Sequence, residues 1–227
     1  MKLRRYSNVE LLVALLLLFV TAPFVEDLPN GNTLEVVLMT VVMISSVLAV
    51  GGGRGNLIVA VVLLLPALAA KWLNHLRPEL LHPAVYFSAS MVFFVYIIAQ
   101  LLRFIVRSPR VDLNVLCGGV SGYLILGLSW TPAYLALDRI HPGSFNLPGT
   151  AAGVTAVLDP YSAFYFSFTT LCTVGYGDIT PASNAARMLA VLESITGLFY
   201  MAVLISRLVS LHASMFHTGG ASKPPTN

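Results

Sequence analysis

The residues whose types and spacing could carry chemistry lie next to one another, in the hexapeptide Thr173-Val174-Gly175-Tyr176-Gly177-Asp178. Successive carbonyls of an ordinary strand point to opposite sides. Turning them all toward one axis requires alternating backbone hands, and Gly175 and Gly177 permit the left-handed ones. Thr173 adds a hydroxyl oxygen beside its carbonyl, and stacked rings of such oxygens can replace the water shell of a cation. Residues of these types at this spacing could therefore hold a dehydrated cation on their oxygens.

The elements that hold this hexapeptide must lie in a membrane, because the chain is too apolar to form the charged surface of a soluble domain. Hydrophobic residues make up 57% of the 227 residues and charged residues only 10%, and the mean hydropathy is +0.82. A membrane-spanning helix needs about 20 mainly apolar residues. That length predicts six spanning helices in an all-α integral membrane protein, at residues 9–25, 33–50, 56–72, 84–107, 112–138 and 183–211.

Residues 161–172 are apolar and aromatic, but the segment is too short to span a membrane. A short helix followed by glycine-containing chain predicts a re-entrant loop. Irregular backbone at membrane depth is tolerated only where it is buried in protein or lines a watery cavity, so residues 173–178 should line a pore. The carbonyl end of the short helix would face the cavity, where its partial negative charge favours a cation. One such strand per chain implies a tetrameric pore, a homotetramer around an axis.

The hexapeptide is similar to the selectivity filter of potassium channels, in which loops from four subunits coordinate the ion. Residues 112–211 look like the two-helix pore domain of bacterial potassium channels. Within them, residues 123–145 (YLILGLSWTPAYLALDRIHPGSF) and 190–211 (AVLESITGLFYMAVLISRLVSL) resemble a bacterial six-span family of ion-channel pore proteins.

This resemblance implies passive conduction of K⁺ without catalysis, with Asp178 at the outer mouth. The residues that would bind K⁺ are Thr173, Val174, Gly175 and Tyr176, with Gly177 completing the filter. The resemblance covers less than half of the chain. Together with the six predicted spans, it divides the chain into a four-helix N-terminal transmembrane domain (residues 1–110), a pore domain (111–212) and a short cytoplasmic tail (213–227).

Set without gaps against the minimal bacterial pore, Gly197 takes the place of the hinge glycine of the inner helix. Tyr165 takes the place of a pore-helix tryptophan that hydrogen-bonds the acid outside the filter, here Asp178. Thr169 stands where the minimal pore has a glutamate partner for that acid, so the resemblance does not extend to that pair. Cys172 replaces a usual threonine, and its side chain is expected to face away from the ion.

Glu193 is expected to be the one carboxylate inside a spanning helix, and ionisable groups there are candidates for function. We expect it behind the filter near Thr169 or Thr170, bracing the pore helix as a neutral acid. Together with Tyr165 and Thr169 it forms the predicted filter support. The alternative is an acid that reaches the outer water.

An apolar stripe at helical spacing on the last helix includes Met201, Ile205 and Val209. Such a stripe usually packs one helix against another. The ungapped comparison instead puts these side chains on the face that lines the cavity, where an apolar ring could gate by dewetting. Both interpretations stay open.

Basic residues predict the orientation, because cytoplasmic loops are enriched in Lys and Arg. With both termini inside, nine of the 13 basic residues are cytoplasmic and four are outside. The outer four are Lys71, Arg77, Arg139 and Arg187, and the inner nine are Lys2, Arg4, Arg5, Arg54, Arg103, Arg107, Arg110, Arg207 and Lys223. A voltage sensor needs about three or four charges within the field. Because Arg103, Arg107 and Arg110 lie at the inner end of the fourth helix, we expect cytoplasmic anchors and little voltage dependence.

His75, Glu79 and His82 could share a helical face as an external proton or metal site. Pro78 and Pro83 interrupt that helix, so solvated loop residues are the favoured interpretation. No zinc spacing, nucleophile–base pair or phosphate loop is found in the sequence, and we expect neither an enzyme nor a cofactor.

The expected partners are membrane lipid and three further identical subunits, without nucleic acid or a soluble ligand, in the bacterial inner membrane. Two alternatives are a weakly selective cation channel and a non-conducting accessory subunit. The sequence does not reveal the gating stimulus, the role of the first four helices, or whether the first helix is retained rather than cleaved as a signal peptide.

Overall fold

The computed structural model describes residues 7–25, 31–50, 54–77, 80, 82–110, 112–149 and 157–219. Within these residues, six helices are long and apolar enough to cross a membrane. They are α1 (Ser7–Val25), α2 (Gly31–Ala49), α3 (Arg54–Leu76), α4 (Pro83–Arg107), α5 (Leu113–Ile140) and α7 (Asn184–Gly219). The predicted all-α membrane fold is therefore confirmed, with helix ends that differ by a few residues.

The last helix is longer than predicted. It continues through Gly219, so part of the expected tail (213–227) is helical. The sequence after residue 211 has no helix breaker before the glycine pair at 219 and 220, which accounts for the extension. Residues 1–6, 26–30, 51–53 and 220–227, with the basic residues predicted there, lie outside the described part of the chain.

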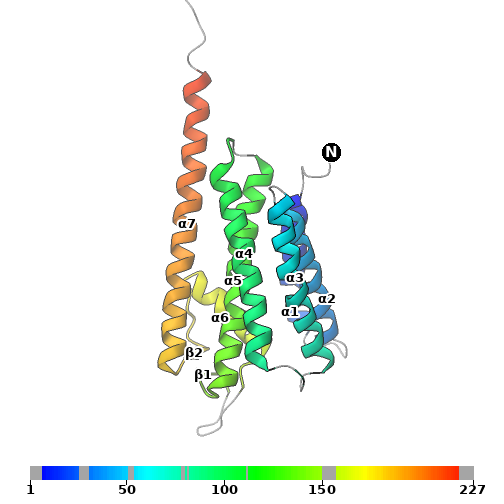
Figure 1. Ribbon diagram of the computed structural model, residues 1–227. Helices are drawn as coiled ribbons and strands as arrows, with labels where there is room; N and C mark the ends of the chain where they lie inside the picture. Colours follow the sequence, from blue (N-terminus) through cyan, green and yellow to red (C-terminus); the bar gives the residue numbers. More distant parts are fainter. Residues whose placement is uncertain are drawn as a thin grey trace, which may run out of the picture.

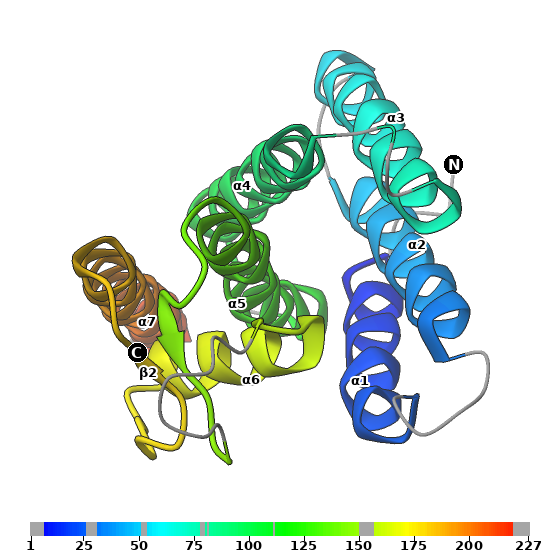
Figure 2. The same cartoon turned by 90° about the horizontal axis from the view of Figure 1, so that it is seen from below.

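Five spanning helices form a closed ring. Helix α1 contacts α2 and α5, and the ring is completed by contacts of α2 with α3, α3 with α4, and α4 with α5. Helix α7 stands beside α5 at the edge opposite α1–α3, as the view along the helices shows (Figure 2). The first turn of α1 and the last turns of α7 lie at the same end of the molecule (Figure 1).

The short helix α6 (Pro160–Leu171) lies between α5 and α7 and contacts both. It begins where the Asp159 carboxylate accepts a hydrogen bond from the Ser162 backbone N–H at 2.9 Å, with Pro160 at the first helical position. Its 12 residues extend about 18 Å at about 1.5 Å per residue, which is too short to cross the membrane. The predicted short helix at 161–172 is therefore present.

A two-residue antiparallel ladder joins the loop after α5 to the chain that follows the hexapeptide. Strands β1 (Phe145–Asn146) and β2 (Thr180–Pro181) pair Phe145 with Pro181 and Asn146 with Thr180. A ladder this short has no periodicity that a sequence could show, because it forms only when segments distant in the sequence meet.

A cluster of aromatic side chains packs α6 against α5 and the β1–β2 ladder. The Tyr134 side chain of α5 is fully buried, and its ring lies edge-on to Phe166 of α6 at 5.0 Å and to Phe145 at 5.6 Å between centroids. Edge-to-face aromatic pairs add to the free energy of burial. This cluster ties the short helix to α5 and to the β1–β2 ladder.

Candidate functional site

The backbone of the hexapeptide alternates in hand. Thr173, Gly175 and Gly177 have φ angles of 57°, 53° and 82°, whereas Val174 and Tyr176 are not left-handed. This alternation is the pattern that turns successive carbonyls to one side. The sequence predicted left-handed backbone at the two glycines but not at Thr173, because β-branched residues rarely adopt it. Such a residue costs about 1–3 kcal/mol and persists only where its surroundings impose it.

The last turn of α6 supplies those surroundings. The Thr173 backbone N–H donates to the Thr170 carbonyl at 3.0 Å, and the Val174 and Gly175 N–H groups donate to the Thr169 carbonyl at 2.9 and 3.1 Å. Three consecutive amides of the strand are therefore anchored on the end of the short helix. These amides therefore bind some of the carbonyl groups at the negative end of α6, the end that is expected to face a cavity.

Further contacts hold the junction between α6 and the strand. The Tyr123 hydroxyl of α5 donates to the Leu171 carbonyl at 3.2 Å. The same hydroxyl lies 3.6 Å from the Cys172 sulfur, and the Cys172 thiol is free and exposed. The Cys172 side chain thus faces α5.

At the C-terminal end of the strand, the Tyr165 hydroxyl donates to Asp178 Oδ2 at 2.8 Å, and the Ile179 backbone N–H donates to Oδ1 at 3.0 Å. Both bonds stabilise the ionised carboxylate. The Tyr165 bond, ahead of the backbone bond, lowers the pKa of Asp178 below its ordinary value. The Thr169 hydroxyl donates instead to the Phe166 carbonyl within α6, at 3.1 Å.

Glu193 of α7 is fully buried, which is inconsistent with an acid that reaches the outer water. Its Oε1 lies 2.6 Å from the Ser167 hydroxyl of α6, and its Oε2 accepts a hydrogen bond from the Tyr134 hydroxyl of α5. The contact with α6 is thus at Ser167, not at the expected Thr169 or Thr170. Sequence reasoning missed Tyr134 and Ser167; their only signal is a hydroxyl within an apolar segment.

Glu193 is not the one carboxylate within a spanning helix, so that expectation is wrong. Glu10, Glu35 and Asp138 lie within α1, α2 and α5. Asp138 is buried, and its Oδ2 accepts from the Leu158 backbone N–H at 2.8 Å. All three also lie inside the predicted spans at 9–25, 33–50 and 112–138, so the sequence already contradicted that expectation.

Gly197 lies in the middle of an unbroken α7. A Cβ atom at this position would lie 2.8 Å from Leu171 Cδ1 and 2.9 Å from the Leu171 carbonyl oxygen. Gly197 therefore allows α7 to pack closely on the end of α6. Met201, Ile205 and Val209 follow on α7 with 39%, 54% and 61% of their surface exposed within the single chain.

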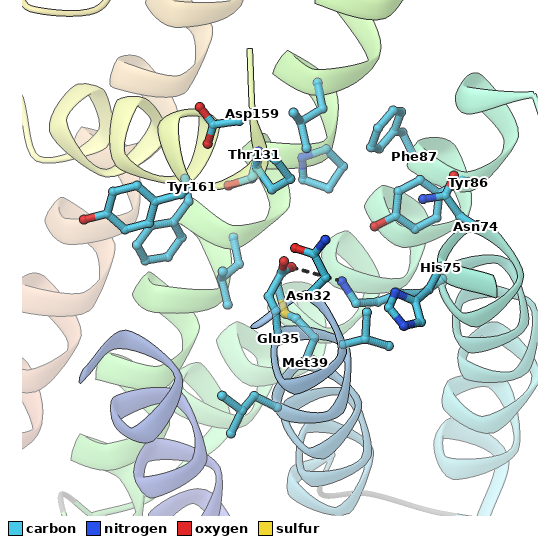
Figure 3. Close-up of a pocket in the computed structure, with 18 of the residues that line it drawn as sticks. Asn32, Glu35, Met39, Asn74, His75, Tyr86, Phe87, Thr131, Asp159 and Tyr161 are labelled. Carbon is cyan, nitrogen blue, oxygen red and sulfur yellow. Dashed lines mark hydrogen bonds and ion pairs between the residues drawn. The ribbon is translucent and has the colours of Figure 1, made fainter. Parts of the chain in front are cut away.

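Residues of helices α1 to α6 line a cavity of about 510 Å³ (Figure 3). Lys71, predicted outside, is buried beside it and lies 3.4 Å from Glu35 Oε1. His75, one turn later, is 3.2 Å from the Thr33 hydroxyl. Glu79 of the predicted proton or metal site lies outside the described residues, and among those described no cluster of three or more metal-binding side chains is found.

These features define a multi-pass helical membrane protein whose re-entrant helix presents a strand of alternating backbone hand. Residues 123–213, from α5 through α7, match the family model described as "Ion channel". The chain is 40% identical over 89 residues to "Two pore potassium channel c" of Oryza sativa subsp. japonica, covering 39% of this chain and 17% of the relative.

Two bacterial proteins are also similar. "Inward rectifier potassium channel Kirbac3.1" of Paramagnetospirillum magnetotacticum is 32% identical over 88 residues, which are 37% of this chain and 25% of the relative. "Voltage-gated potassium channel Kch" of Escherichia coli (strain K12) is 43% identical over 47 residues, 21% of this chain and 11% of the relative. The chain therefore spans a quarter or less of each of these relatives. No solved structure matches the chain.

Proposed function

We propose that this chain is one subunit of a passive potassium-selective channel, with Thr173 to Gly177 as its filter. The observation that carries this proposal is the alternating backbone hand at Thr173, Gly175 and Gly177, on the end of a short helix between two spanning helices. The same region is similar to proteins named as potassium channels. Stacked carbonyl rings would replace the water shell of K⁺.

The filter would be completed by three further copies of the chain. Val174 and Tyr176 are 49% and 73% exposed in the single chain, so their side chains have apolar surface for a neighbour to cover. On α7, Leu198 and Phe199 are 61% and 68% exposed. A homotetramer would cover the strand side chains and leave the outer helices to lipid.

The remaining assignments follow from this arrangement. Residues 1–110 form a supporting domain, 111–212 the pore and 213–227 a cytoplasmic tail. The protein lies in a bacterial inner membrane, with both termini on the cytoplasmic side. Asp178 rings the outer mouth, and Tyr165, Thr169 and Glu193 support the filter.

The inner helix carries the proposed moving parts. Gly197 serves as the hinge, and Met201, Ile205 and Val209 serve as an apolar gate. The channel has little voltage dependence, because Arg103, Arg107 and Arg110 are all at the inner end of α4 or beyond it and all exposed. It uses no cofactor and catalyses no reaction.

The test is ion flux into liposomes that contain the purified protein, with K⁺ and Na⁺ gradients compared and barium as blocker. Gly175→Ala is expected to abolish K⁺ flux, because the φ angle of 53° at this position strains any residue that has a Cβ atom. The Cβ itself would meet no atom within 4 Å, so the effect would come from the backbone and not from a clash. Gly149→Ala is the matched control, since Gly149 has φ of 75° and equally open surroundings away from the filter. Its flux should stay unchanged.

Equal K⁺ and Na⁺ flux would favour the weakly selective cation channel. Absence of flux from the folded tetramer, with and without the blocker, would favour a non-conducting accessory subunit and contradict the proposal.

A further inference from the structure

Four residues from three helices form a chain of polar contacts behind the proposed filter. The Tyr134 hydroxyl of α5 contacts Glu193 Oε2 of α7, and Glu193 Oε1 lies 2.6 Å from the Ser167 hydroxyl of α6. The Ser167 hydroxyl also lies 2.8 Å from the Gly127 carbonyl of α5. The chain begins and ends on α5, and it passes through both other helices of the pore region.

The protons in this chain can be counted. Each of its three oxygen–oxygen contacts needs one proton, since two oxygens at such distances repel without one. The Tyr134 and Ser167 hydroxyls carry one proton each, and the Gly127 carbonyl carries none. An ionised Glu193 would therefore leave one contact unfilled, whichever way the hydroxyls turn. A neutral Glu193 supplies the third proton and satisfies all three contacts.

The surroundings agree with a neutral acid. Tyr134, Ser167 and Glu193 are all completely buried. Among the described residues, the one ion pair is that of Lys71 with Glu35, so no cation there is paired with Glu193. Leaving a buried carboxylate charged without a cation is costly, because its water shell is lost and not replaced. Among the described residues, the Tyr123 phenol of α5 is a further titratable group that interacts with Glu193.

We propose that Glu193 is held as a neutral carboxylic acid that donates its proton to Ser167, and that Tyr134 and Ser167 are positioning residues for the pore helix. Ser167 then donates to the Gly127 carbonyl, and Tyr134 donates to Glu193. The chain fixes α6 at the turn directly before Thr169 and Thr170, whose carbonyls anchor the filter amides. The effect on the filter rests on the proposed channel function, whereas the position of the proton does not.

Infrared spectroscopy of the purified protein tests the proton directly. The wild-type spectrum minus that of Glu193→Gln should contain a carboxylic-acid C=O band. Tyr134→Phe should move that band to higher frequency, because the carbonyl loses one hydrogen bond while the aromatic ring stays in the core. Glu35→Gln is the matched control: Glu35 is paired with Lys71, so its loss should remove only carboxylate bands. A difference spectrum for Glu193 that contains only carboxylate bands would overturn the proposal.

Flux measurements test the positioning role. A glutamine can fill the three contacts, since its amide N–H donates to Ser167 and its carbonyl accepts from Tyr134. Glu193→Gln should therefore keep K⁺ flux, whereas Glu193→Ala should lower it by roughly tenfold, because displaced filter ligands bind less well. Equal losses in both folded variants would contradict the positioning role. If wild-type liposomes show no K⁺ flux, the proposed channel function fails and the infrared result still decides the proton.

Discussion

The Tyr165 hydroxyl donates a hydrogen bond of 2.8 Å to the Asp178 carboxylate. This bond joins the short helix α6 to the chain that leaves the proposed filter. The sequence alone implied this pair only through a resemblance in which tryptophan stands at the tyrosine position. A phenol and an indole can each donate one hydrogen bond, and the contact requires the end of the Tyr165 side chain to meet residue 178. The β1–β2 ladder, two residues further along, helps to fix that approach.

This contact predicts a dependence on acidic pH. Because the pKa of Asp178 lies below its ordinary value of 3.8, the carboxylate adds stability that is fully present above that value. That stability is lost as the pH falls through the lowered pKa. Tyr165→Phe should raise the pKa of Asp178 toward 3.8, so that the carboxylate is protonated at higher pH and contributes less stability. Titration of the Asp178 carboxyl carbon by NMR measures the shift.

The control for this titration is Tyr161→Phe, which alters a tyrosine one turn earlier on α6 and leaves the Asp178 donor in place. Its titration should match that of the wild type. An unchanged Asp178 pKa in Tyr165→Phe would contradict the role given to the phenol.

Thr173 offers a test that separates its hydroxyl from its backbone strain. Thr173→Ser keeps the hydroxyl and removes the β-branch that makes the left-handed backbone costly, so K⁺ binding should persist. Thr173→Val keeps the branch and removes the oxygen. K⁺ affinity measured by calorimetry in a Na⁺ background should fall by about tenfold in the valine variant, the loss of about one favourable polar contact. Equal affinity in both variants would show that the hydroxyl does not bind the ion.

Gly197→Ala distinguishes a packing residue from a hinge. The added methyl group would meet the Leu171 carbonyl oxygen at 2.9 Å, which is backbone and cannot turn aside. Overpacking of this kind typically lowers the free energy of unfolding by about 1–3 kcal/mol. The matched control is Gly55→Ala in α3, where a Cβ meets no atom within 4 Å. Denaturation of both variants in detergent measures the difference, and lost flux with unchanged stability would favour a hinge alone.

Arg207 of α7 makes a hydrogen bond to the connection between α4 and α5. Its Nη2 donates to the Ser108 carbonyl at 2.9 Å. Arg207→Met keeps the aliphatic part of the side chain but loses this charged hydrogen bond. The free energy of unfolding should therefore fall by about 1.5–3 kcal/mol. Arg103→Met removes an exposed arginine of α4 and should change it by no more than about 0.5 kcal/mol. Equal effects of the two substitutions in thermal denaturation would contradict the tie.

Much of the architecture could be predicted from the sequence, because its signals are local. Six long apolar segments determine six spanning helices, since hydrocarbon thickness sets the length that each must have. The short segment before Thr173 predicts α6 for the same reason. The two glycines of the hexapeptide indicate left-handed backbone. Each of these inferences needs only neighbouring residues.

The tertiary structure alone decided what surrounds Glu193. Tyr134 and Ser167 stand 59 and 26 residues away in the sequence, and no local spacing relates either of them to an acid on α7. The left-handed Thr173 is likewise imposed by amide bonds to the end of α6 rather than by its own preference. In both cases the deciding free energy comes from burying polar groups together, and burial is defined only once the helices have packed.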